Sequence, residues 1–172
     1  MTSKVNWWLT RTAGTVLLWE MLPAYLERLN VVTGGVFRDD DQRARAPALL
    51  HYLATGQTQC AESQLVLAKL LCGVAPETPV LTNVDVNANV SAVTEDLIAF
   101  VLSRWSAVGV ASPDGFRGSF LCRDGQLSRG EDRWTLDVEP RTYDLLLDSF
   151  PFPISIVKTP WMTEPLFVRW RK

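Results

Sequence analysis

The sequence predicts an α+β fold, with a mainly helical body of about five helices and a small antiparallel β-sheet in the C-terminal third. Two observations predict it. Apolar residues recur at three- and four-residue spacing through residues 14–121, which is typical of amphipathic helices. After the turn-forming pair Asp124-Gly125 they recur at every second position, which is typical of strands. A chain of 172 residues can bury one core without metal or disulfide bonds, so we expect a single domain, 1–172.

The first helical segment contains apolar residues with helical spacing: Val16, Leu17, Trp19, Leu22, Leu26 and Leu29. Pro23 lies inside this segment, where it either kinks the helix or begins a second helix at its first position. Gly34-Gly35 is expected to end the segment. A second long helix is expected to begin at Asp39–Asp41, because acidic residues suit the positive end of the helix dipole, and to end at Gly56.

Three more helices are expected before the spacing of apolar residues changes from the helical to the strand pattern. One runs from about residue 61 to residue 72, followed by a looser connection over residues 74–92. The next is capped by Thr94, because Glu and Asp fill the turn that follows and apolar residues then line one face. A shorter helix begins at Ser112-Pro113-Asp114 and should end near Leu121.

Strand spacing is clearest over Trp134–Val138, and residues 126–128 can pair with it across a short loop. One or two helical turns are expected at 143–147. The last two strand candidates are 154–157 and 166–170. Within the domain, the sequence thus divides into three parts: 1–13, interpreted as a docking arm, 14–121, the helical part, and 122–172, the β-rich part.

Composition excludes several classes of function. The net charge is −2, so the chain lacks the basic footprint of a nucleic-acid-binding protein, and we expect no nucleic acid partner. The apolar stretch 13–19 is too short to cross a bilayer, so we expect no membrane insertion. The three cysteines form no C-x-x-C pair, which indicates reduced thiols.

No residue set predicts catalysis, a cofactor or a metal. His51 is the only histidine and is interpreted as a surface or capping residue. The run Asp85–Asp96 has the spacing of a calcium loop, but Val90 stands where that loop needs glycine. Cys122 follows a helix and precedes Arg123, whose charge would lower the thiol pKa, although a buried structural thiol is commoner. Phosphate-binding loops and nucleophile elbows are absent from the sequence, so we expect a protein that is not an enzyme.

The unusual feature is the aromatic content of seven Trp, seven Phe and three Tyr. Large apolar side chains gather at the two ends of the chain, where each belongs either to the core or to a contact with a partner. Seven of them are the candidate interface: Trp7, Trp8, Phe152, Trp161, Met162, Phe167 and Trp170. A sheet covered by helices on one face would leave Phe167 exposed or in an interface. Trp7 and Trp8 are sharper candidates, because an N-terminal segment with adjacent tryptophans is expected to dock either on this domain or on another subunit.

A series of short strings also resembles a known family. The strings are His51-Tyr-Leu-Ala-Thr-Gly56, Leu65-Val-Leu-Ala-Lys-Leu-Leu-Cys-Gly73, Phe116-Arg-Gly-Ser-Phe-Leu121, Arg123-Asp-Gly-Gln-Leu127, Trp134-Thr-Leu-Asp-Val-Glu139, Tyr143-Asp-Leu-Leu-Leu147, Pro151-Phe-Pro-Ile154, Lys158-Thr-Pro-Trp-Met162 and Leu166-Phe-Val-Arg-Trp170. In their order and spacing they resemble the C-terminal region of the contractile injection system tape measure protein family, over residues 14–170. Contractile injection systems are phage-tail-like particles with a sheath, an inner tube, a spike and a baseplate.

The resemblance implies a non-enzymatic structural role in tube assembly or length control. Its implied partners are other particle subunits (baseplate hub, spike or inner tube), and its implied location is the bacterial cytoplasm during assembly and the particle if it is retained. Family members are typically much longer, and 172 fully helical residues would reach only about 260 Å. An anchor therefore suits this chain better than an extended ruler. An assembly chaperone or adaptor, a delivered effector and a homo-oligomer remain open alternatives.

Overall fold

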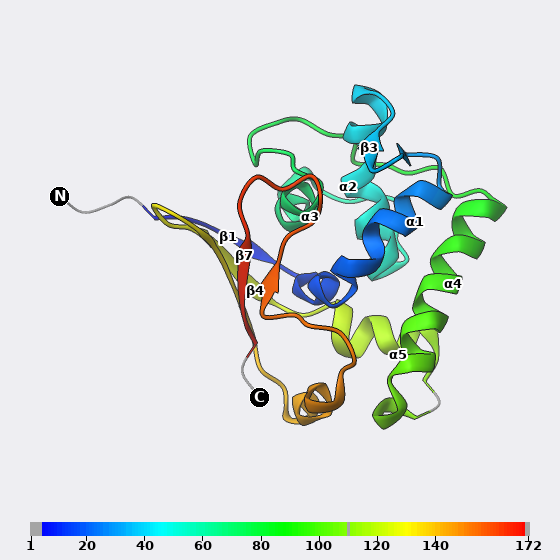
Figure 1. The fold of residues 1–172 in the computed structure, drawn as a ribbon, viewed down its shortest axis with the longest axis vertical. Helices are drawn as coiled ribbons and strands as arrows, with labels where there is room; N and C mark the ends of the chain where they lie inside the picture. The colour runs from blue at the N-terminus through cyan, green and yellow to red at the C-terminus, as the bar shows by residue number, and fades with distance from the viewer. Residues whose placement is uncertain (1–4, 110, 171–172) are drawn as a thin grey trace.

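The computed structural model describes residues 5–109 and 111–170, and it confirms the α+β class (Figure 1). The helices gather on one side of the molecule, and a five-stranded sheet stands at the other, seen almost edge-on in this view. A second sheet has two strands. The helix α4 lies at the side of the body away from the large sheet.

The helical elements include several short 3₁₀ turns and one π-helical turn, η4. In chain order they are η1 (Ala13–Met21), α1 (Leu22–Arg28), α2 (Asp40–Thr55), η2 (Glu62–Gln64), α3 (Val66–Leu71), α4 (Ala88–Arg104), η3 (Ser106–Val108), α5 (Pro113–Phe116), η4 (Arg117–Leu121) and η5 (Thr142–Ser149). The strands are β1 (Asn6–Thr10), β2 (Val32–Thr33), β3 (Val36–Phe37), β4 (Gly125–Arg129), β5 (Trp134–Val138), β6 (Ile156–Val157) and β7 (Leu166–Trp170).

Pro23 begins a second helix rather than kinking the first, because it lies in the first turn of α1, where its missing N–H is not needed. The pair Gly34-Gly35 does more than end the segment. Both residues have positive φ angles, 61° and 81°, which a tight hairpin turn requires, and they join β2 to β3. The sequence interpretation missed this hairpin.

The helix α2 has the predicted ends. Asp39 is its N-cap and accepts a hydrogen bond from the backbone N–H of Gln42 at 2.8 Å, and Gly56 follows its last turn. The predicted cap of α4 was wrong. Asn87 caps that helix by accepting from the N–H of Val90 at 2.8 Å, and Thr94 lies fully buried inside it, 2.8 Å from the hydroxyl of Tyr25. Burial raises the pKa of Tyr25 to about 12.

The large sheet has the strand order β1-β4-β5-β7-β6 and is mixed, not antiparallel as predicted. The exception is the pair β5 and β7, which run parallel with Trp134 opposite Leu166 and Val138 opposite Trp170. A long connection that includes η5 separates these two strands, and parallel neighbours need such a crossover. The N-terminal residues 6–10, interpreted as part of a docking arm, form the strand at one edge and pair with β4.

The core lies between the helices and the inner face of the sheet. Leu127 and Leu136 are opposite each other on β4 and β5 and are fully buried. Deeper in the helical body, Trp105 is also fully buried, and its ring packs edge-on against Phe120 at 4.8 Å and Phe150 at 5.0 Å. Its indole N–H donates to the carbonyl of Leu146 at 3.0 Å, which fastens η5 to the body.

Candidate interaction surface

The face of the large sheet that points away from the helices is bare in Figure 1. Since side chains alternate along each strand, the pairing register determines which residues share this face. They form two rows that run across the sheet. One row is Leu9, Gln126, Asp137 and Arg169, and the other is Trp7, Ser128, Thr135, Phe167 and Ile156. We call these nine residues the outer face.

Apolar side chains stand at both sides of the outer face and polar ones lie between them. On β1, Trp7 is 58% exposed and Leu9 is 68% exposed. At the opposite edge, Ile156 is 53% exposed and lies beside the half-buried Phe167, whose ring is 4.5 Å from the guanidinium carbon of Arg133. Isolated exposed apolar residues are ordinary, but two pairs on one face are typical of a contact surface.

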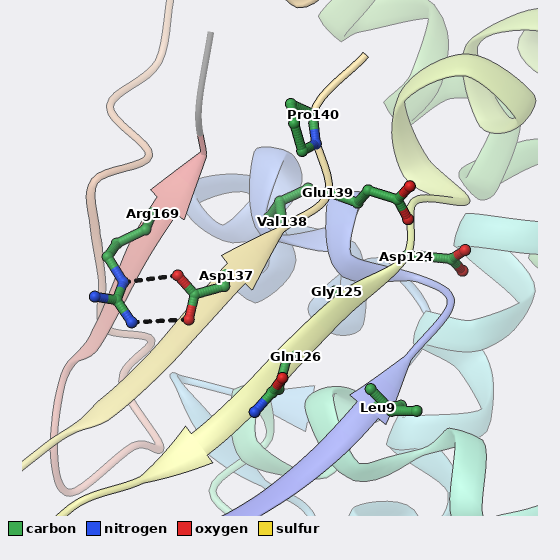
Figure 2. Close-up of a pocket in the computed structure, with 9 residues that line it drawn as sticks. All are labelled: Leu9, Asp124, Gly125, Gln126, Asp137, Val138, Glu139, Pro140 and Arg169. Carbon is green, nitrogen blue, oxygen red and sulfur yellow. Dashed lines mark hydrogen bonds and ion pairs between the residues drawn. The ribbon is translucent and has the colours of Figure 1, made fainter.

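The polar middle is held by a two-point ion pair. Figure 2 shows Arg169, Asp137, Gln126 and Leu9 in order across β7, β5, β4 and β1. The guanidinium of Arg169 contacts both carboxylate oxygens of Asp137, at 2.7 Å and 2.8 Å. These residues line a shallow groove of about 550 Å³, with Glu139 also in its wall. The charge of Asp137 is therefore neutralised by Arg169 within the groove.

A buried ion pair fixes the sheet to the helical body. Arg123 follows η4 and Asp144 lies on η5, and both side chains are shielded from solvent. The guanidinium donates to both carboxylate oxygens of Asp144 at 2.6–2.8 Å. The same carboxylate accepts from the indole N–H of Trp170 at 3.0 Å and from the backbone N–H of Arg141 at 2.9 Å. The end of β7, and with it the outer face, is therefore tied to η5.

The structure places the sequence-predicted interface residues in different environments. Trp7 and Phe167 lie on the outer face. Trp8 points to the inner face, half-buried, with its ring 5.5 Å from that of Trp134. Trp170 is half-buried and donates its hydrogen bond to Asp144 within the chain.

The other three predicted interface residues make contacts inside the chain. Trp161 donates to the carbonyl of Gly35 at 3.0 Å and stacks on Phe37 at 4.9 Å, so it clamps the β2–β3 hairpin. Phe152 packs between Phe100 and Phe150. Met162 is 96% buried, and a partner could reach it only if the fold opened.

Sequence reasoning missed Leu9, Ile156 and the Asp137–Arg169 pair as members of the surface. The signal for Leu9 was present, because Trp7 and Leu9 have the two-residue spacing of one strand face. The pairing of Asp137 with Arg169 carries no local signal, since the two residues meet only through the parallel register of β5 and β7.

The titratable residues singled out from the sequence do not form a second site. His51 is buried in α2, not on the surface, and neither ring nitrogen has a hydrogen-bond partner. The expected effect of Arg123 on Cys122 was wrong, because Arg123 turns to Asp144 instead. Cys122 is exposed and is not the buried thiol that is commoner in such a position, and partial desolvation still raises the pKa of the thiol, which Arg117 offsets only in part. Among residues 5–109 and 111–170, no group of three metal-binding side chains comes together.

Burial of His51 makes the stability of the fold depend on pH. Desolvation lowers the pKa of its imidazole below 6.5, so the unfolded chain binds the proton more readily than the folded chain does. This contribution to stability is complete above about pH 6.5 and is lost as the pH falls, with a slope of at most about 1.4 kcal/mol per pH unit. We expect His51→Leu to flatten the fall in unfolding free energy between pH 7.5 and pH 5, measured by urea titration. Equal slopes in the two proteins would contradict this.

The comparison with protein families decides which family the chain belongs to. The family described as "Contractile injection system tape measure protein" matches residues 2–170. This chain belongs to the contractile injection system tape measure protein family. No curated protein and no solved structure was found to match it.

The family match extends over every strand that the structure of the tape measure domain describes, from β1 to β7, so the outer face lies wholly inside the matched range. Its membership of this family thus identifies the chain as a component of a contractile injection system. Among the residues that the structure describes, no helix is long and apolar enough to cross a membrane.

Proposed function

We propose that this tape measure domain is a non-enzymatic anchor, which binds another particle subunit (baseplate hub, spike or inner tube) through the outer face during tube assembly. The supporting observation is the outer face itself, an uncovered side of the sheet with Trp7 and Leu9 at one side and Phe167 and Ile156 at the other. Burial of such side chains against a partner contributes about 1.5–3 kcal/mol each, while the Asp137–Arg169 pair between them sets orientation.

A second apolar area lies between α1 and α4, where a groove of about 280 Å³ is lined by Met21, Ala24, Tyr25, Val93, Leu97 and the exposed Phe100. In the described part of the chain, the other exposed large apolar residues outside the outer face are Val5 before β1, Val36 on β3, Leu81 in a loop, and Tyr143 and Leu145 on η5. The outer face is preferred because Trp7, Leu9 and Ile156 are each more than half exposed on it. A folded body of short helices also spans far less than a continuous helix of the same length, which favours an anchor over an extended ruler. We place the domain in the bacterial cytoplasm during assembly and in the finished particle if it is retained.

Deletion of the domain from its gene tests the role in assembly. We expect particles without tubes, or with tubes of scattered length, in electron micrographs, and restoration by the wild-type gene supplied in trans. Mass spectrometry of purified wild-type particles separates an anchor from a chaperone, because an anchor is retained and a chaperone is absent. Normal particles of normal length after deletion would refute the proposal.

A further inference from the structure

The large sheet has a free edge at β1, where a further strand could pair. Within the described part of the chain, β4 is the only strand that pairs with β1, so the other side of β1 has no neighbouring strand, and residues 6–9 are exposed or half-buried there while Thr10 is buried. Natural edge strands are usually protected by charged side chains, proline or a bulge. The strand Asn6–Thr10 contains no charge and no proline, and its pairing with β4 is one-to-one without a bulge.

We propose that β1 pairs with β1 of a second copy of this chain, antiparallel about a two-fold axis at Trp8, to form one continuous ten-stranded sheet. This register sets Trp8 opposite its own copy and places Trp7 of one copy opposite Leu9 of the other, twice. Because Trp7 and Leu9 lie on the same face of the sheet, their exposed side chains meet across the new edge.

Charge favours this antiparallel, self-complementary arrangement. The exposed Arg11 follows the strand directly. Antiparallel pairing sends the Arg11 residues of the two copies to opposite ends of the contact, whereas parallel pairing would set them side by side. The two-fold axis also keeps the outer faces of both copies on the same side, so self-pairing leaves Phe167 and Ile156 free for another subunit.

The size of the contact predicts its strength. Four apolar side chains and one strand edge bury less than the roughly 1,600 Å² of a standard interface. We therefore expect a weak dimer in free solution, which forms at high protein concentration or where copies are held together. This inference does not depend on the proposed anchoring role, and its test uses purified protein alone.

Disulfide trapping tests the register. One chain carries Trp7→Cys and the other Leu9→Cys, both in a Cys122→Ser background to remove the exposed native thiol. Opposite residues in an antiparallel pair have Cα atoms about 4.5–5.5 Å apart, within reach of a disulfide, while two Trp7 positions are diagonal at about 7–8 Å. The mixed dimer keeps the other Trp7–Leu9 pair intact.

We expect the mixture of the two variants to give at least about tenfold more cross-linked dimer on oxidation than either variant alone. In sedimentation experiments the wild-type dimer fraction should rise with protein concentration. Leu9→Lys should weaken association about tenfold or more, because each of the two copies would bury one lysine charge in the contact. The control Leu145→Lys, at an equally exposed position on η5, should leave association unchanged. A wild-type chain that stays monomeric to about 1 mM, or equal cross-linking in all mixtures, would overturn the proposal.

Discussion

Asp144→Ala is expected to lower the free energy of unfolding by about 3–5 kcal/mol, because it leaves the guanidinium of Arg123 buried without its counter-ion. The substitution also removes the acceptor for the indole N–H of Trp170 and for the backbone N–H of Arg141. Urea titration followed by circular dichroism measures the change.

A matched control is Asp96→Ala, which removes an exposed ion pair with Arg28 whose side chains are 54% and 61% exposed. That pair should contribute no more than about 1 kcal/mol. The double variant Arg123→Met and Asp144→Leu removes both buried charges and should recover much of the stability lost by Asp144→Ala. If Asp144→Ala costs no more than Asp96→Ala, the ion pair does not fasten the sheet as we describe.

Structural features that depend only on residues close together in the chain could be predicted from the sequence. The ends of α2 follow from Asp39 and Gly56, and the hairpin of β4 and β5 follows from alternation on either side of a short loop. Each of these signals lies within a few residues of the structure it specifies. The cap of α4 was misplaced because both Asn87 and Thr94 are good capping residues, and only burial of Thr94 distinguishes them.

Features that depend on distant pairing could not be predicted. The strand β1 pairs with residues about 120 positions away, and β5 finds its parallel partner only after η5. The sorting of the aromatic residues depends on the same long-range contacts. Trp161 is held by the hairpin around Gly35, while Trp7 lies exposed at the sheet edge. Composition identified the aromatic residues as important, and the register of the sheet decides which of them face outward.

The largest functional effect is expected from a charge placed on the outer face. Phe167→Asp puts a carboxylate on the outer face where an apolar contact is proposed, so a partner surface would have to bury a charge there. Ile156→Asp does the same at a more exposed position of the neighbouring strand. Leu145→Asp, 64% exposed on η5, is the matched control away from the sheet. Thermal unfolding of the purified variants first establishes that each is folded.

The most direct measurement is the content of the altered chain in purified particles, by quantitative mass spectrometry, together with tube length in electron micrographs. The anchoring account predicts that Phe167→Asp and Ile156→Asp lower incorporation at least about tenfold, as expected for the loss of one buried apolar contact, and scatter or abolish the tubes. It predicts wild-type particles for Leu145→Asp. Folded outer-face variants that enter particles at the wild-type level, with tubes of normal length, would contradict it.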